Sequence, residues 1–245
     1  GLAAQWAADG NWSHGFLVAP LAVWLGCRRR AALAATPPHP SVAGLAVVAA
    51  GLGLLAVGRL GAELFLARLS LVVVVTGAVL ALWGSGRLRV LALPLAFLLL
   101  AVPWPAIVFN QLALPLQLVA SQAGEICLRL GEVPVLREGN VLVLPGTTLE
   151  VAEACSGIRS LVSLTVLALV VGEITLDRPA LRAVLAALTL PAAVGANAAR
   201  VAATGLAAHY WGAEAARGVF HGFSGWIVFG AALALLLAAA RALAV

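Results

Sequence analysis

A cysteine, a small-residue turn and an arginine stand together where a polar segment of the chain gives way to a long apolar run. The stretch reads Glu-Ala-Cys-Ser-Gly-Ile-Arg-Ser-Leu over residues 153–161. Free N–H groups at a helix N-terminus and a nearby cation both lower the pKa of a thiol and make it nucleophilic. We predict Cys155 to be such a nucleophile, supported by Glu153, Ser156 and Arg159. The alternative is a small residue that only fills the start of a helix.

Two further residues have useful chemistry inside or beside apolar runs. Arg200 follows Asn197 by three residues, which places both on one helix face. An arginine at membrane depth is costly and usually serves a function, although it can also snorkel to the interface. His221 begins the last apolar run, and an imidazole suits proton transfer near neutral pH. His209 is its competitor, but small residues surround only His221.

His14 is a weaker candidate for a supporting role. It stands in Trp-Ser-His-Gly over residues 12–15, and a histidine beside tryptophan is equally expected at a membrane interface. The three cysteines, Cys27, Cys127 and Cys155, are far apart, so they form neither a disulfide framework nor a metal motif. We therefore predict no metal and no cofactor.

The composition is that of a membrane protein. The chain is 63% hydrophobic and 10% charged, with a mean hydropathy of +1.06, whereas soluble domains are about 45–50% apolar and about 25% charged. The net charge is +5, and every basic residue is arginine. These arginines lie in short loops, which suits orientation in a bilayer rather than binding of nucleic acid. We predict one all-α polytopic membrane domain over residues 1–245.

Seven apolar runs divide the chain, most of them near the ~17–20 residues that span a bilayer. They cover residues 12–27, 41–58, 66–83, 88–106, 157–174, 180–205 and 221–240. The chain contains no Met, so we expect a further helix before Gly1, which would make eight.

The arginines predict which ends of these runs face the cytoplasm. Strict alternation of the runs places four groups on one side: Arg28, Arg29 and Arg30; Arg87 and Arg89; Arg178 and Arg182; and Arg241. The positive-inside rule makes that side cytoplasmic. Residues 107–156, and Cys155 with them, then lie on the extracytoplasmic side.

The segment over residues 107–156 differs from the rest. An apolar stretch carries a polar stripe at spacing four, formed by Gln117, Ser121, Glu125 and Arg129. We expect a helix lying in the outer interface, or one packed against other helices. Short β-rich runs separated by turn residues follow, over 133–136, 141–144 and 147–151. They predict a small extracytoplasmic hairpin or three-stranded meander that leads into Cys155.

On this topology Cys155, Arg200 and His221 come from three helices and meet near the outer leaflet. Together they suit acyl transfer. The thiolate attacks a carbonyl, the guanidinium stabilises the developing charge, and the imidazole protonates the leaving amine.

These motifs resemble the exosortase/archaeosortase family over nearly the whole chain. The resemblance is carried by residues 153–161, by Asn-Ala-Ala-Arg at 197–200 and by His-Gly-Phe-Ser-Gly at 221–225. It extends to residues 12–18, where Trp12 replaces the family's usual Tyr, to Pro-Trp-Pro at 103–105 and to residues 131–151.

The resemblance implies a polytopic cysteine transpeptidase of the bacterial or archaeal cytoplasmic membrane. It makes Cys155 the nucleophile, Arg200 the stabilising cation and His221 the acid/base. The implied partners are secreted proteins with a membrane-anchored C-terminal sorting tail of the PEP-CTERM type, transferred through a thioester to an acceptor. The alternatives are a transporter, or a noncatalytic subunit of an export or polysaccharide system. Transporters often carry inverted repeats, and none is evident here.

Overall fold

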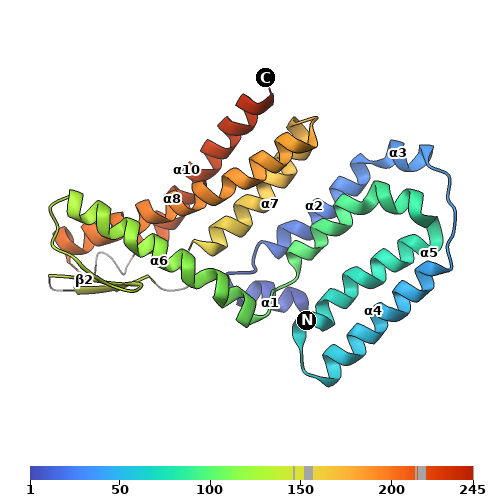
Figure 1. Ribbon diagram of the computed structural model, residues 1–245, viewed down its shortest axis with the longest axis horizontal. Coiled ribbons are helices and arrows are strands. Elements are labelled where there is room, and N and C mark those ends of the chain that lie inside the picture. Colours follow the sequence, from blue (N-terminus) through green and yellow to red (C-terminus); the bar gives the residue numbers. More distant parts are fainter. Residues whose placement is uncertain (146, 152–156, 213, 215–218, 245) are drawn as a thin grey trace. The chain divides into compact units, whose positions relative to one another are not determined.

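The computed structural model describes residues 1–145, 147–151, 157–212, 214 and 219–244, without the side chains of 219–222. Within the described chain, contacts form two compact units, Gly1–Pro105 and Ala106–Val245, which we describe in turn (Figure 1). The single domain over residues 1–245 stays a prediction.

The first unit consists of helices. Its elements are α1 (Leu2–Ala8), α2 (Gly15–Arg28), α3 (Arg30–Ala35), α4 (Ala43–Leu60), α5 (Leu64–Leu98) and the short 3-10 helix η1 (Leu99–Ala101). Helices α4 and α5 pack along each other (Figure 1). Buried glycines seven residues apart in α4, Gly51 and Gly58 among them, allow this approach. A Cβ at Gly58 would lie 2.6 Å from the Ala67 backbone nitrogen, so only glycine fits there.

Helix α5 is divided by a kink. Gly84 has φ 80° and ψ 179°, which is not helical, and it separates the two apolar runs predicted over 66–83 and 88–106. Near this kink, two arginines donate hydrogen bonds to backbone carbonyls of neighbouring segments. Arg29 Nη1 donates to the Val90 carbonyl at 3.0 Å, and Arg87 Nε donates to the Thr36 carbonyl at 2.9 Å. Two of the predicted arginine groups therefore share one end of this unit.

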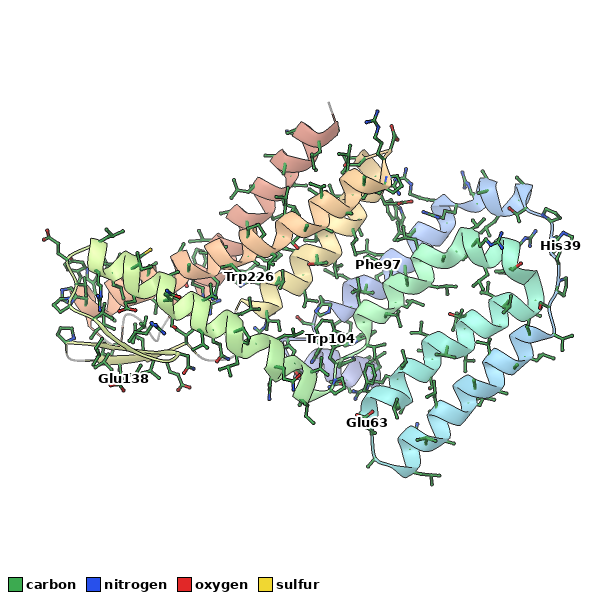
Figure 2. The ribbon with its side chains drawn as sticks, viewed as in Figure 1. His39, Glu63, Phe97, Trp104, Glu138 and Trp226 are labelled. Atoms are coloured by element: carbon green, nitrogen blue, oxygen red, sulfur yellow. The ribbon has the colours of Figure 1, made fainter. Side chains whose placement is uncertain are left out.

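Among its described residues, the second unit combines four long helices with a small sheet. Helix α6 (Ala106–Leu130) leads into β1 (Leu136–Glu138), β2 (Val141–Leu144) and β3 (Thr147–Glu150), and α7 (Ile158–Thr175), α8 (Pro179–Trp211) and α10 (Val219–Ala244) follow. The strands form an antiparallel sheet in the order β1-β2-β3, so the predicted meander is confirmed. Figure 2 labels Glu138 in this sheet and Trp226 in α10.

Two buried apolar clusters hold the second unit together, one at each end. At one end the sheet packs on α6 and α8 through Leu128, Leu142 and Val201. At the other end the α7–α8 turn packs against the C-terminal part of α10 through Leu176 and Leu236. Arg182 pairs with Glu173 at this second end and also donates to the Leu176 carbonyl. Arg178, Arg182 and Arg241 thus lie at the end opposite the sheet.

Within the described residues, six helical stretches are long and apolar enough to cross a membrane, and α2 is a shorter apolar helix. The all-α polytopic membrane class predicted from the sequence is confirmed. The six stretches are Ala43–Leu60, Leu64–Ala101, Ala106–Leu130, Ile158–Thr175, Pro179–Trp211 and Phe223–Ala244. Helix α6 is among them, so its length and composition also suit a spanning helix, while its placement in the interface stays a prediction.

Candidate active site

The predicted nucleophile lies between two well-defined anchors. Residues 152–156, with Glu153, Cys155 and Ser156, lie outside the described residues. The chain enters this segment from β3 through Val151, which is buried. It leaves the segment at Gly157, the N-cap of α7. The contacts of Val151 and Gly157 therefore hold the chain on either side of the segment that contains Cys155.

The entry anchor, Val151, is held by one residue, Asn140. The Val151 N–H donates to the Asn140 carbonyl at 2.8 Å, and Asn140 Nδ2 donates to the Val151 carbonyl at 3.3 Å. Asn140 Nδ2 also lies 3.4 Å from Gln117 Oε1 on α6. Both backbone groups of Val151 are thus tied to the β1–β2 turn, which is itself tied to α6.

The polar stripe of α6 contacts the β-meander. Besides the contact of Gln117, Ser121 Oγ donates to the Gly139 carbonyl at 2.9 Å. Glu125 accepts from Arg137 of β1 at 2.9 Å and from Arg129 at 2.7 Å. The stripe therefore holds the meander against α6. The spacing of four reveals the stripe, but the meander residues that it contacts lie 12 to 23 positions away in sequence, so the sequence pattern does not indicate that Asn140 contacts this anchor.

The exit anchor packs against the middle of α8. Gly157 has φ 78°, the left-handed region that favours glycine. A Cβ at this position would lie 3.0 Å from Asn197 Cβ and 3.1 Å from Asn197 Cγ. Asn197 is buried and takes part in polar interactions. The structure thus places Gly157, two residues after Cys155 in the sequence, against Asn197 of the Asn-Ala-Ala-Arg motif.

Arg200 connects α8 with α10. Its side chain is half-buried, and Nη1 lies 3.6 Å from the position that a Cβ of Gly225 would occupy. Gly225 therefore leaves room for the guanidinium above α10. Ser224, beside it, is buried. Residue 221 lies one turn before Gly225 in α10, although the His221 side chain is outside the described residues.

Two other predicted residues have different surroundings. Arg159 is exposed in the first turn of α7 and takes part in a polar interaction. His209, the competitor of His221, packs edge-on against Tyr210, with ring centroids 4.9 Å apart.

His14 is a buried residue of the first unit, 5% exposed. Its Nε2 lies 3.0 Å from the Leu100 carbonyl, which can only accept, so Nε2 carries the proton. Burial lowers the pKa of this imidazole, which stands before α2 and outside the spanning stretches. Trp12 lies beside it, with ring centroids 5.8 Å apart, and contacts Trp104 in turn. These contacts connect the start of α2 with η1 and Trp104, while a supporting role of His14 in catalysis stays a prediction.

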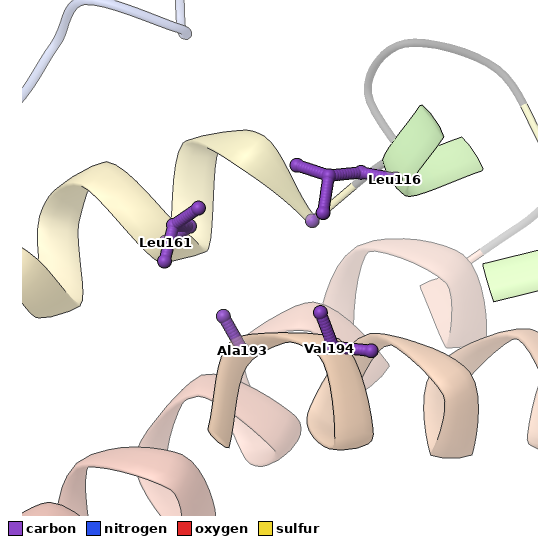
Figure 3. Close-up of a pocket in the computed structure, with 5 residues that line it drawn as sticks. Leu116, Leu161, Ala193 and Val194 are labelled. Atoms are coloured by element: carbon purple, nitrogen blue, oxygen red, sulfur yellow. The ribbon is translucent and has the colours of Figure 1, made fainter. Parts of the chain in front are cut away.

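A small apolar recess borders the exit anchor (Figure 3). Leu116, Leu161, Ala193 and Val194 line it together with Gly157, and it holds about 150 Å³ of space, including its open side. Among the described residues, no three His, Cys, Asp or Glu side chains gather into a possible metal site.

The fold is that of a polytopic membrane protein, and in its second unit Gly157 at the start of α7 contacts Asn197 of α8, while Arg200 of α8 lies beside Gly225 of α10. A sequence model described as transmembrane exosortase matches residues 6–238, and the chain belongs to this family. No curated protein and no solved structure matches it. Family membership indicates a membrane transpeptidase of the cysteine peptidase type.

Proposed function

We propose that the protein is a membrane cysteine transpeptidase in which Cys155, Arg200 and His221 act together on the C-terminal tails of secreted proteins. Two contacts support this proposal. Gly157 packs on Asn197, and Arg200 packs over Gly225. Together they bring the start of α7, which follows Cys155, and the helix turn of α10 that follows His221 to the middle of α8, where Arg200 lies.

The reaction proceeds in two stages. The Cys155 thiolate attacks the scissile carbonyl carbon, and the guanidinium of Arg200 stabilises the oxygen that gains negative charge. The C–N bond then breaks, His221 gives a proton to the leaving amine, and a thioester remains. An acceptor amine or water attacks the thioester, gives its proton to His221 and releases the thiolate. Glu153, Ser156, Arg159 and Asn197 are the proposed supporting groups.

The chemistry takes place on the extracytoplasmic face of the cytoplasmic membrane. In the second unit, Arg178, Arg182 and Arg241 lie at the end opposite the sheet. The positive-inside rule assigns such an arginine-rich end to the cytoplasm. The substrate's tail helix would reach the site from within the bilayer.

The test is co-expression with a secreted protein that carries a membrane tail, followed by mass spectrometry of the released product. We expect Cys155→Ala to abolish processing, while Cys127→Ser, which changes an exposed free cysteine, keeps it. Arg200→Ala and His221→Ala should each lower the rate by at least about 100-fold, whereas His209→Ala should not. A hydroxylamine-sensitive adduct on Cys155 would report the thioester. Normal processing by Cys155→Ala would favour a noncatalytic role instead.

A further inference from the structure

In the described part of the chain, the strand that leads into the cysteine segment has one edge with which no other strand pairs. Strand β3 pairs with β2, in the register Leu142↔Leu149 and Leu144↔Thr147. No other strand of the described chain pairs with its outer side. Because the Val151 N–H donates toward β2, and antiparallel hydrogen bonds alternate, Leu149 and Thr147 also face β2. The backbone groups of Thr148 and Glu150 therefore point to the outer edge.

This edge is fixed in place although its outer side is unpaired. Leu149 packs on the buried cluster that contains Leu142 and Val201, so α8 and the sheet core support the strand from behind. Thr148 and Glu150 are exposed. Native proteins protect edge strands by short length, by charged side chains and especially Lys, by Pro or by bulges, and β3 is short and carries the charged Glu150. The four residues of β3, Thr-Thr-Leu-Glu, include neither Lys nor Pro, and the ladder to β2 is regular.

The edge lies close to the proposed nucleophile along the chain. Cys155 follows Glu150 by five positions in the sequence, and five steps along an extended chain span at most about 18 Å. A peptide that pairs with β3 would thus have its next few residues within reach of the thiol. An extended polypeptide is the ligand that adds to a strand edge, because the backbone groups supply the hydrogen bonds.

We propose that the outer edge of β3 is the docking site for the extended segment of the polypeptide substrate next to the scissile bond. The substrate adds as a fourth strand and bonds with the N–H and C=O groups of Thr148 and Glu150. Because only every second residue of a strand faces its neighbour, alternate amides of the substrate carry the binding. The proposal rests on the proposed function in naming the substrate, while the edge itself is a property of the sheet.

A proline at residue 148 tests the edge from the side of the protein. Thr148→Pro removes the outward N–H and leaves the ladder to β2 intact, since proline is tolerated on an outer edge. We expect it to raise KM for processing at least tenfold, while the rate of Cys155 alkylation by iodoacetamide and the melting temperature stay near those of the parent. Thr148→Ala loses the side chain but keeps the N–H, so its KM should rise far less than that of Thr148→Pro. Normal processing by Thr148→Pro would overturn the proposal.

A peptide scan tests the same edge without altering it. The probe is a fluorescent synthetic peptide that copies the cleavage region of the processed protein, with one N-methyl amide at each position in turn. Binding to the full chain carrying Cys155→Ala should weaken at every second position, and a loss that ignores this alternation would overturn the proposal. This binding is read without catalysis, so it stands apart from the fate of the Cys155 mechanism. If the edge instead joins two copies of the chain, Thr148→Pro would abolish dimers in cross-linking and leave processing unchanged.

Discussion

Gly157 lies directly against Asn197, at a distance that leaves no room for a Cβ. An added Cβ would fall 3.0 Å from Asn197 Cβ, and the φ of 78° is itself unfavourable for any other residue. The contact matters because Gly157 begins the helix that follows the cysteine segment. It sets the position of that helix start against α8.

Gly157→Ala tests this contact. The left-handed backbone alone should cost about 1–2 kcal/mol, and Asn197 must move as well, so we expect a lower melting temperature and slower processing. The matched control is Gly195→Ala, which lies within α8 itself and has open space around its Cβ position. Because alanine favours helix more than glycine does, Gly195→Ala should be neutral or stabilising. If Gly157→Ala and Gly195→Ala had the same melting temperature and the same rate of processing, the close contact between Gly157 and Asn197 would be contradicted.

The Arg200 guanidinium limits the size of the side chain that residue 225 can carry. A Cβ there would meet Nη1 at 3.6 Å, an ordinary contact, so Gly225→Ala should retain processing. Gly225→Leu should displace the guanidinium and lower processing at least about tenfold, equivalent to about 1.4 kcal/mol of transition-state stabilisation. Gly230→Leu, where the Cβ position is open, is the control on the same helix. Full activity of Gly225→Leu would argue against a role for Arg200 at this place.

Asn140 is expected to act as a positioning residue for the cysteine segment. Asn140→Asp replaces the amide donor that serves Val151 and Gln117 with an acceptor, which leaves the Val151 carbonyl without its side-chain partner at a cost of about 1–3 kcal/mol. Processing should fall, and the pH profile of Cys155 alkylation should shift. Asn110→Asp makes the same change at an exposed position of α6 and should leave both unchanged. An unaltered pH profile in Asn140→Asp would show that the contact is only structural.

His14 should make the stability of the protein depend on pH. Burial lowers the pKa of the folded imidazole below its usual 6.5, so the unfolded chain binds more protons just below pH 6.5. The stabilisation is therefore complete above about pH 6.5 and declines as the pH falls toward the folded pKa. His14→Phe should be less stable at neutral pH, because the Leu100 carbonyl loses its donor, and should lose this pH dependence. Melting curves recorded between about pH 5 and pH 8, the range in which histidine titrates, measure both effects.

Labelling from outside the cell tests the orientation. A membrane-impermeant maleimide applied to intact cells should react with Cys155, whereas Cys27, which is exposed next to the arginines at the end of α2, should react only after permeabilisation. Single-cysteine variants, in which the other two are changed to serine, separate the signals. Labelling of Cys155 only in permeabilised cells would contradict the proposed orientation and place Cys155 on the cytoplasmic side.

The sequence by itself determined the membrane class, the apolar runs and the three motifs. Long apolar runs report their environment directly, since a bilayer accepts few other segments as helices. The turn residues of 131–151 likewise specified a meander, because hairpin geometry depends on neighbours in sequence. The pairing of Arg29 with Val90 and of Arg87 with Thr36 agrees with the arginine alternation that was read from the loops.

Only the tertiary structure decided what each polar group contacts. The stripe on α6 is visible as a period of four, yet a period specifies a face and not its partner. Ser121 and Glu125 contact the meander, and His14 binds the Leu100 carbonyl 86 residues away. Likewise, the motif around residue 157 shows a glycine, but its need for glycine comes from Asn197, 40 positions along the chain. Long-range packing selects these partners, and local sequence carries no record of it.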